Sequence, residues 1–578
     1  MSRNADHHCC AALMRYAHRT NSQPMAPLQQ IPATAPSPLQ TFLARLESSI
    51  RHRSGTWTYA LLAAGLLVRL WHASGTFLNP DEALHFYSAN QISWWLTYKS
   101  SLTLYHPPLL ILLLHAWRPL GTSELVLRLP SILAGTAFCC FLYRWLGMLF
   151  EESVTWIAFV FALFLPSSID LSAEIRQYAL LLAFAMASAY WLERALAKNS
   201  VPLMLLSAVC LWLAILSHYS AFLLAAALAV YSILRMAQRR PPLRVFATWE
   251  AGQVIALGLC YFLYVTHIST LGGRSGAGSA ADWGVPYLGN SYFVPGKVNP
   301  LLFIFARTGG VFQYDFGQSA VGDLAYPLFV AGIILLFRKP AFGRLSSRQL
   351  GVLLALPFVL NCTAALARLY PYGGTRHSAF LLPFALAGVS IALAHLLKNR
   401  LAFGVVTALL ISLLCNVVSS HRAPYMSRQE QSSANMKAAL DFIHQKVAPR
   451  EPIFTDYQTS LMLHYYLCEP QPVAMSRSAP GLLSFECGGH RVISADWNTF
   501  AFTPRSFADR WQTLVAKYNL APGSRVWVTQ MGWSTHLATD LQNFPEFHFA
   551  PHFFGNRIQV FDLTVGQRMP DPERLPTS

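Results

Sequence analysis

The chain has 578 residues, of which 54% are hydrophobic and only 12% are charged. Soluble globular proteins carry about a quarter of charged residues, so this composition excludes an ordinary soluble protein. The formal net charge of +16 could suggest a nucleic-acid partner, but the Lys and Arg residues lie in short clusters between apolar segments. That distribution is typical of the loops that orient a membrane protein, and we expect no nucleic-acid binding.

Residues 1–56 are rich in Pro, Gln and Ser, and we expect them to form a disordered cytoplasmic tail. The first apolar segment that follows lacks a cleavage site for a signal peptide and therefore predicts a signal anchor. From there to residue 420 the sequence predicts eleven membrane-spanning helices. Their ranges are 57–74, 125–146, 153–170, 178–196, 201–217, 219–235, 246–266, 322–337, 350–368, 378–397 and 402–419.

The segment 106–117 is excluded from these spans because its apolar part is too short to cross a bilayer. With this choice the basic clusters all fall on one side of the membrane, which the positive-inside rule assigns to the cytoplasm. They contain Arg51, Arg53, Arg194, Lys198, Arg235, Arg239, Arg240, Arg244, Arg338, Lys339, Arg344, Arg348, Lys398 and Arg400. The segment 106–117 and the loop 267–321 then lie at the outer face.

An acidic pair, Asp81 and Glu82, follows the first predicted span. Asn79 is a favourable N-cap, Pro80 suits the first helical position, and Glu82 is placed to complete a capping box. We expect one helix to start here and to run along the membrane surface to residue 98. Capping accounts well for Glu82, whereas for Asp81 the structural alternative is a favourable interaction with the helix dipole.

Other polar residues are expected at the same outer face. His85 lies one turn after Asp81 and shares its side of the helix. The remaining candidates are His106, Arg128, Asp170, Glu174, Arg176, Tyr178, His218, Arg376 and His377.

Residues 421–578 alternate between helical and strand patterns and predict a small α/β domain outside the membrane. The predicted strands are 451–457, 490–495, 524–530 and 556–565. Cys468 and Cys487 are the only cysteines of this region, and the sequence leaves open whether they form a disulfide. The ten cysteines of the chain contain no C-x-x-C pair, so no zinc or redox site is indicated.

Several motifs together resemble a known superfamily. They are "NPDEALHFY", "YHPPLLILLLHAWRPLGTSELVLRLPSILAG", "SAEIRQYALLL", "SHYSAFLL" and "LYPYGGTRHSAFLLPF". Their order and spacing over residues 57–420 resemble the GT-C glycosyltransferases, in particular the bacterial proteins similar to dolichyl-phosphate-mannose protein mannosyltransferases (family 39) and to lipid A aminoarabinose transferases. The resemblance implies a GT-C catalytic domain with juxtamembrane helices in its first outer loop, located in the bacterial inner membrane.

The resemblance also implies an activity. Such enzymes move a sugar from a polyprenyl-phosphate donor to an acceptor at the extracytoplasmic face. Asp81 matches the acid of the family's "DE" pair and is expected to act as general base, with Glu82 counted beside it as a candidate catalytic residue. A single displacement by one base predicts inversion at the anomeric carbon.

Arg376 is the first candidate for binding the donor phosphate, since a guanidinium group can hold two phosphate oxygens. Gly373 and Gly374 would let the backbone approach the phosphate. Arg176 is the second candidate, with Glu174 as its positioning partner. The motif "E-x-R-x-Y", which ends at Tyr178, differs from the lipid A branch and puts an aminoarabinose donor in doubt.

Several of the remaining candidates keep more than one interpretation. His106 either lines the site, contacts a metal, or is a satisfied interfacial residue, and His218 either binds substrate or packs. Arg128 is either a phosphate ligand or a residue that reaches the headgroups. His377 is grouped with Arg376 as substrate-binding. No cofactor is expected to be required, although a divalent metal near Glu82 and His106 is possible.

Three other functions are compatible with the sequence: a transporter or flippase of lipid-linked sugars, a non-catalytic membrane scaffold, and a glycan polymerase or ligase that uses a pyrophosphate carrier. Transporters typically show internal repeats and polar residues in mid-span, whereas here the polar residues gather at one face. The sugar, the acceptor (protein, lipid or glycan) and the length of the lipid cannot be deduced.

The predicted topology can be tested with fusion reporters. A reporter fused after Ser420 should be active only outside the cytoplasm, and a reporter fused after Arg240 only inside. The reverse pattern would separate Asp81 and Arg376 from the outer face.

Overall fold

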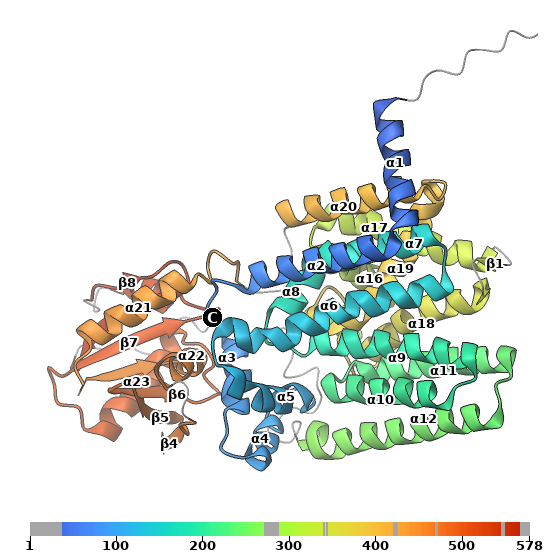
Figure 1. Cartoon of the computed structure of the whole chain (residues 1–578). Coiled ribbons are helices and arrows are strands. Elements are labelled where there is room, and N and C mark those ends of the chain that lie inside the picture. The colour runs from blue at the N-terminus through green and yellow to red at the C-terminus, as the bar shows by residue number, and fades with distance from the viewer. Residues whose placement is uncertain are drawn as a thin grey trace, which may run out of the picture.

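The computed structural model describes residues 37–270, 288–338, 341–342, 345–419, 426–449, 451–468, 472–544 and 549–566. Long helices run side by side in one body, and a sheet domain formed by the C-terminal part of the chain covers one end of it (Figure 1). The protein is a polytopic α-helical membrane protein with a C-terminal α/β domain, as the sequence predicts.

Each of the eleven segments predicted as a span is helical. Their helices are α2 (Ser54–Ala73), α6 (Glu124–Leu149), α7 (Glu152–Phe164) with α8 (Pro166–Ala173), α9 (Tyr178–Lys198), α10 (Val201–Ser217), α11 (Ala221–Arg239), α12 (Leu243–Leu263) with η2 (Tyr264–Ile268), α17 (Ser319–Arg338), α18 (Ser347–Leu366), η4 (Arg376–Leu381) with α19 (Leu382–Leu396), and α20 (Leu401–Val417). Two short strands, β1 (Ala341–Phe342) and β2 (Leu345–Ser346), lie between α17 and α18.

By length and composition, seven helices in the described ranges can cross a membrane, or eight if the bent pair α7 and α8 is one span. The predicted count of eleven is therefore met only in part. Helices α10 and α20 are apolar but have 17 residues each. Helix α2 has 20 residues, but Arg69 and His72 lower its apolar character.

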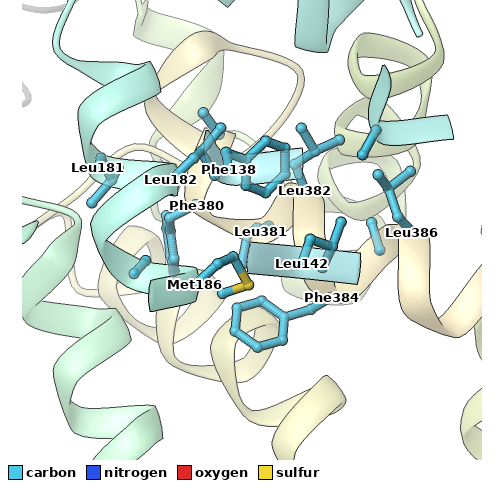
Figure 2. Packing of buried hydrophobic residues seen from close by; sticks show 14 of the residues in the cluster. Phe138, Leu142, Leu181, Leu182, Met186, Phe380, Leu381, Leu382, Phe384 and Leu386 are labelled. Atoms are coloured by element: carbon cyan, nitrogen blue, oxygen red, sulfur yellow. The ribbon is translucent and has the colours of Figure 1, made fainter. Parts of the chain in front are cut away.

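The core of the helical body forms where α6, α9, η4 and α19 meet. Figure 2 shows Phe138 and Leu142 of α6 facing Met186 of α9 and Phe384 of α19. These side chains are at most 1% exposed. Apolar residues on all sides of α9 and α19 are buried, which explains why these two helices show no polar face in the sequence.

The tail predicted as disordered up to residue 56 contains a helix, α1 (Pro38–His52). The side chain of Ser37 accepts a hydrogen bond from the backbone N–H of Gln40, whose side chain accepts one from Ser37 N–H, so a capping box starts the helix. Ile50 is buried against the helical body. Residues 1–36 of the predicted tail lie outside the described residues.

The first outer loop is helical, but the single helix expected up to residue 98 is divided into α3 (Pro80–Ala89) and α4 (Trp94–Ser101). The side chain of Arg118 donates hydrogen bonds to Asn90 Oδ1 and to Gln91 O, which fixes the break. Ser93 caps the start of α4. The segment judged too short to span forms α5 (Leu109–Trp117), followed by η1 (Arg118–Leu120).

The outer loop predicted at 267–321 contains another helix, α16 (Pro300–Phe316), preceded by a 3-10 turn, η3 (Gly289–Ser291). Asn299 caps α16, and Gly317 ends it in a left-handed conformation with φ of 68°. The side chain of Ser167 donates a hydrogen bond to Asp315 O, so the end of α16 is held against α8.

The C-terminal domain is a seven-stranded sheet with strand order β4-β5-β6-β3-β7-β9-β8. Strand β3 pairs in parallel with β6 and β7, and the other neighbours are antiparallel. The strands are β3 (Pro452–Thr455), β4 (Ser476–Ala479), β5 (Leu482–Cys487), β6 (His490–Ala495), β7 (Arg525–Met531), β8 (His552–Phe553) and β9 (Ile558–Thr564). The helices are α21 (Ser433–Lys446), α22 (Tyr457–Cys468), α23 (Pro504–Tyr518) and α24 (Leu537–Gln542).

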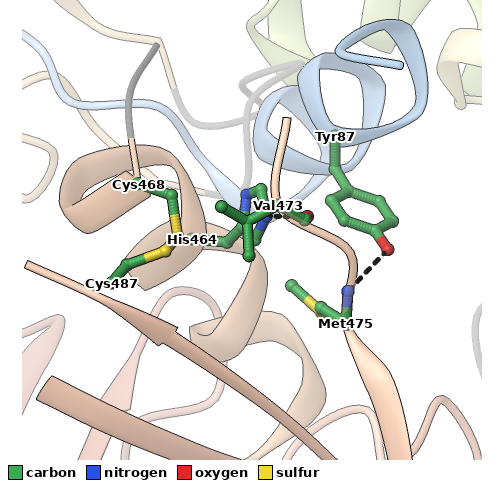
Figure 3. The surroundings of a disulfide bond; sticks show 6 residues. All are labelled: Tyr87, His464, Cys468, Val473, Met475 and Cys487. Carbon is green, nitrogen blue, oxygen red and sulfur yellow. Dashed lines mark hydrogen bonds between the residues drawn. A yellow bond between two sulfur atoms is a disulfide. The ribbon is translucent and has the colours of Figure 1, made fainter. Parts of the chain in front are cut away.

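All four predicted strands are present, as β3, β6, β7 and β9. The question of the two cysteines is answered, because Cys468 and Cys487 form a disulfide with a Cα–Cα distance of 5.0 Å (Figure 3). It ties the last residue of α22 to the last residue of β5.

A buried arginine holds the bend between α7 and α8. Pro166 has no N–H group, so it cannot donate to Ala162 O, four residues before it. Arg69 of α2 is 0% exposed and donates to Ala162 O at 3.1 Å and to Leu163 O at 3.0 Å. Its cation thereby meets the negative end of the α7 dipole, and its Nε donates to Ser172 Oγ of α8 at 2.9 Å.

We expect Arg69→Leu to destabilise the protein, because Leu163 O would lose its donor and each unpaired buried carbonyl costs about 1–3 kcal/mol. The thermal midpoint in detergent should fall. Arg51→Ala is the control, since its ion pair with Glu47 is exposed and worth about 1 kcal/mol or less. Equal midpoints for the two variants would contradict the role given to Arg69.

Candidate active site

The site begins at the N-terminus of α3, where the predicted capping box is present. Asn79 Oδ1 accepts the backbone N–H of Glu82 at 3.0 Å, and Glu82 Oε2 accepts the backbone N–H of Asn79 at 3.0 Å. The expectation that Asn79, Pro80 and Glu82 start a helix is confirmed.

The carboxylate of Glu82 also has partners far away in the sequence. It is 0% exposed and receives Arg128 Nε on Oε1 and Arg128 Nη2 on Oε2, both at 2.7 Å. Oε1 further accepts the backbone N–H of Ile175 at 3.0 Å. Each of the two carboxylate oxygens thus accepts at least two hydrogen bonds. This geometry favours the structural role of Glu82 over a catalytic one.

Arg128 is more deeply buried than either interpretation of its role predicts. Besides Glu82, it binds the carbonyl oxygens of Ala73, Thr76 and Phe77 at 2.8–3.0 Å. It is 1% exposed. The guanidinium group therefore joins the end of α2 to the start of α3 from within, and it neither reaches the headgroups nor faces open space where a phosphate could bind.

Asp81, the neighbour of Glu82, faces two guanidinium groups. Its Oδ2 accepts a hydrogen bond from Arg376 Nη2 at 2.9 Å and a second from Arg176 Nη2. In the part of the chain that the structure describes, Oδ1 accepts no hydrogen bond. The side chains are buried but not sealed, since Asp81 is 17%, Arg376 12% and Arg176 7% exposed. Three segments that are distant in the sequence thus converge on one carboxylate.

Glu174 completes this group as the positioning partner expected for Arg176. Its Oε1 accepts Asn79 Nδ2 at 3.2 Å, and its Oε2 lies 4.0 Å from Arg176 Nε. Burial, together with the nearby charge of Glu82, raises the pKa of Glu174 to about 7. The carboxyl group of Glu174 therefore keeps its proton more readily than an exposed glutamate.

Gly373 and Gly374 serve a purpose different from the expected approach to a phosphate. A Cβ atom on Gly374 would lie 2.6 Å from Gly310 O, and one on Gly373 would lie 3.2 Å from Arg307 Cδ. The two glycines let the loop before Arg376 pack against α16. Arg307, which the sequence analysis missed because its segment was taken as a loop, thereby lies beside this loop, and no ion pair to it is found among the described residues.

His106 pairs with His85 and lies at the site as one of its buried walls. The two Nε2 atoms are 2.7 Å apart, while His85 Nδ1 lies 2.9 Å from Ile175 O and His106 Nδ1 3.1 Å from Pro107 O. Burial lowers the pKa of His106 to about 4. Because a carbonyl oxygen only accepts, each Nδ1 must carry the ring proton to bond there, and two neutral rings then bring two unprotonated Nε2 atoms together. One more proton is needed for a hydrogen bond between the Nε2 atoms, so the structure leaves both interpretations of His106 open.

The last three candidates gather in one aromatic cluster. The ring of His218 lies 5.0 Å from that of Tyr178 and 6.3 Å from that of His377. His218 Nδ1 is 2.8 Å from Ser220 Oγ. His377 follows Arg376 directly, so this cluster supports the turn that presents Arg376.

The possible metal near Glu82 and His106 finds no ligand set. Across the ranges that the structure describes, no three His, Cys, Asp or Glu side chains are grouped so that they could hold a metal ion. Glu82 is paired with Arg128, and His106 lies against His85.

Comparison with known proteins gives a family model that matches part of the chain and a solved structure with a similar fold. Residues 105–264 match a protein-family model described as dolichyl-phosphate-mannose-protein mannosyltransferase. The solved structure of ArnT from Cupriavidus metallidurans bound to undecaprenyl phosphate matches with a TM-score of 0.50 and 14% sequence identity, over 89% of this chain and 99% of that one. The two chains share a fold over most of their lengths. This likeness agrees with the resemblance inferred from the sequence.

Two further solved structures show a weaker likeness. The oligosaccharyltransferase AglB from Archaeoglobus fulgidus has 11% identity over 83% of this chain and 70% of that one, with a TM-score of 0.46. The protein O-mannosyltransferase Pmt1-Pmt2 complex of S. cerevisiae has 18% identity over 40% and 35%, with a TM-score of 0.31. No curated protein matches the sequence.

Glu82→Gln should destabilise the protein strongly, because it leaves the buried cation of Arg128 without its anion. Breaking a buried pair in this way costs about 3–5 kcal/mol, and the thermal midpoint in detergent should fall accordingly. Glu486→Gln, which removes an exposed ion pair with Arg491, should leave it nearly unchanged. A stable but inactive Glu82→Gln protein would instead restore a catalytic role for Glu82.

Proposed function

We propose that this protein transfers a sugar from a polyprenyl-phosphate donor to an acceptor at the extracytoplasmic face of the membrane, with inversion and with Asp81 as general base. The matched family model carries dolichyl phosphate mannose in its description, and the similar structure of ArnT holds undecaprenyl phosphate. Both names contain a polyprenyl phosphate, which supports this class of donor for the present chain.

The observation that carries the proposal is the asymmetric environment of Asp81. Both guanidinium groups bind Oδ2, so Oδ1 remains to accept a proton from the hydroxyl or amine of an acceptor. A base held by its second oxygen keeps a fixed orientation. Glu82 cannot take this role, because Arg128, Asn79 and Ile175 occupy its oxygens.

The same environment supports binding of the donor phosphate. Two guanidinium groups lie together here, Arg176 between Asp81 and Glu174 and Arg376 beside Asp81, and such donors can stabilise the charge of an arriving phosphate. Arg376 is the better ligand, because it is more exposed than Arg176 and its planar fork can hold two phosphate oxygens. Arg307, on the other side of the 373–374 turn, is a further cation within the same outer region.

The proposed reaction is a single displacement. The acceptor loses its proton to Asp81 Oδ1 as its oxygen or nitrogen forms a bond to the anomeric carbon. The bond from that carbon to the phosphate oxygen breaks on the opposite side, and the lipid phosphate leaves as an anion beside Arg376. Attack and departure on opposite faces invert the configuration.

The location and the domain division belong to the same proposal. We place the protein in the bacterial inner membrane with a cytoplasmic N-terminus, residues 57–420 as the catalytic domain and residues 421–578 outside. The convergence of Asp81, Arg176 and Arg376 supports this orientation, since the distribution of basic clusters predicts one common face for all three.

Purified protein incubated with a panel of labelled polyprenyl-phosphate and polyprenyl-pyrophosphate sugars tests the donor class. Transfer from a monophosphate donor is expected, with release of the lipid phosphate. Transfer from pyrophosphate donors alone would favour the polymerase or ligase alternative. Repeating the assay with a chelator tests the dependence on a divalent metal.

Asp81→Asn should lower the transfer rate by about 10²–10⁴-fold, the usual effect of removing a general base. The amide still fits the first turn of α3, so the protein should stay folded, which a thermal midpoint in the same detergent checks. Asp323→Asn is the control: this acid is exposed on α17, bonds only to Gln313 in the described part of the chain, and should transfer at the wild-type rate. Wild-type activity of Asp81→Asn would contradict the mechanism.

A further inference from the structure

The short segment 75–80, which connects α2 to the helix of Asp81, is held by the C-terminal domain. The backbone N–H of Phe77 donates to Gln431 O at 2.9 Å, and the backbone N–H of Ser433 donates to Gly75 O at 3.0 Å. Thr76 and Ser432 pair as an antiparallel bridge. The side chain of Gln431 also donates to Phe77 O. Residues 431–433, more than 350 positions away in the sequence, thus pair with this segment as a neighbouring strand would.

The next residue, Leu78, is held by a side chain of α22. Its backbone N–H donates to Tyr466 Oη at 3.0 Å, and the same hydroxyl donates to Glu124 Oε1 at 3.0 Å. A tyrosine hydroxyl can accept and donate at once. Because Glu124 takes its proton, the lone pairs of Oη are directed at Leu78. Tyr466 therefore links the start of α6, the start of α3 and the C-terminal domain at one atom.

Helix α22 also packs against the second half of α3. The ring of Tyr465 lies 5.0 Å from that of Phe86, and the ring of His464 lies 4.9 Å from that of Tyr87. Figure 3 shows Tyr87 reaching across to the backbone N–H of Met475, which donates to its hydroxyl at 3.4 Å. At the start of α3 the contact comes from the residue after β7. A Cβ atom on Gly532, at φ of 108°, would lie 2.7 Å from Pro80 Cγ.

We propose that the C-terminal domain contributes to the active site and that Tyr466, a residue of this domain, positions Asp81. By fixing Leu78, three residues before Asp81, the Tyr466 hydroxyl sets the start of α3 against α6. The carboxylate then stays between Arg176 and Arg376 with Oδ1 turned to the acceptor. This inference rests on the proposed function, because it takes Asp81 as the base.

Loss of the Tyr466 hydroxyl should change kcat and the KM for the donor to different extents. Asp81 acts on the acceptor while the bond is being made, so a shift of its carboxylate lowers kcat more than it raises the KM for the donor. Misplacing a catalytic group by about 1 Å can cost about 100-fold in rate. Loss of one hydrogen bond that holds Leu78 should therefore lower kcat by about 10- to 100-fold with little change in the donor KM.

Tyr466→Phe tests this, with Tyr465→Phe as a matched control. The two residues are neighbours on α22, but the hydroxyl of Tyr465 donates to Thr122 O at 2.7 Å, just before α6. Tyr466→Phe should show the loss of kcat and Tyr465→Phe should not, at equal thermal midpoints. Glu124→Ala, which frees the Tyr466 hydroxyl to turn away from Leu78, should change kcat in the same direction.

Combining Tyr466→Phe with Asp81→Asn separates positioning from a general structural effect. If Tyr466 acts through Asp81, it should add no further loss to the residual rate of the Asp81→Asn protein. A full additional loss, or wild-type kinetics of both Tyr466→Phe and Glu124→Ala, would overturn the inference. If Asp81→Asn is itself fully active, the proposed function fails; if Asp81→Asn is impaired and Tyr466→Phe is not, only the positioning role fails.

Discussion

The buried pair of Glu82 and Arg128 is the interaction on which the site depends. Its two ions are 0% and 1% exposed, and each would carry a penalty of several kcal/mol if it were unpaired. The pair is stable because its spare positions are also used, by Asn79 and Ile175 on the carboxylate and by the carbonyl groups of residues 73–77 on the guanidinium. Glu82 thus binds α3, α6 and the turn before α9 at one point.

The catalytic arrangement follows from that junction. Because Glu82 holds the backbone of Ile175, the next side chain, Arg176, is delivered to Asp81, which precedes Glu82 in the sequence. One acid of the pair therefore builds the site, and the other is the base that we propose. Arg69, which holds the bend between α7 and α8, also supports the turn at residues 174–177. Helix α8 ends at Ala173, so fixing α8 fixes the start of this turn.

Local features of this site could be predicted from the sequence, and long-range ones could not. The capping box of Asn79 and Glu82 spans three residues, so its geometry is set by the helix itself. The partners of Arg128 are 46 to 55 residues away, and nothing in the pattern "LRLP" distinguishes a buried ion pair from a headgroup contact. Gly373 and Gly374 were correctly expected to allow close approach, but the neighbour is α16, a helix hidden in a stretch that looked like a loop. The break between α3 and α4 depends on Arg118, which again comes from another element.

The link between α22 and the 75–80 segment has a consequence for the order in which the molecule is made. Asp81 is synthesised early, whereas Gln431 and Tyr466, which hold the backbone just before it, emerge only after the last membrane helix. The disulfide at Cys468 closes α22 against the sheet two residues beyond Tyr466. The contacts that hold the backbone just before Asp81 are therefore complete only when the C-terminal domain has been translated and folded.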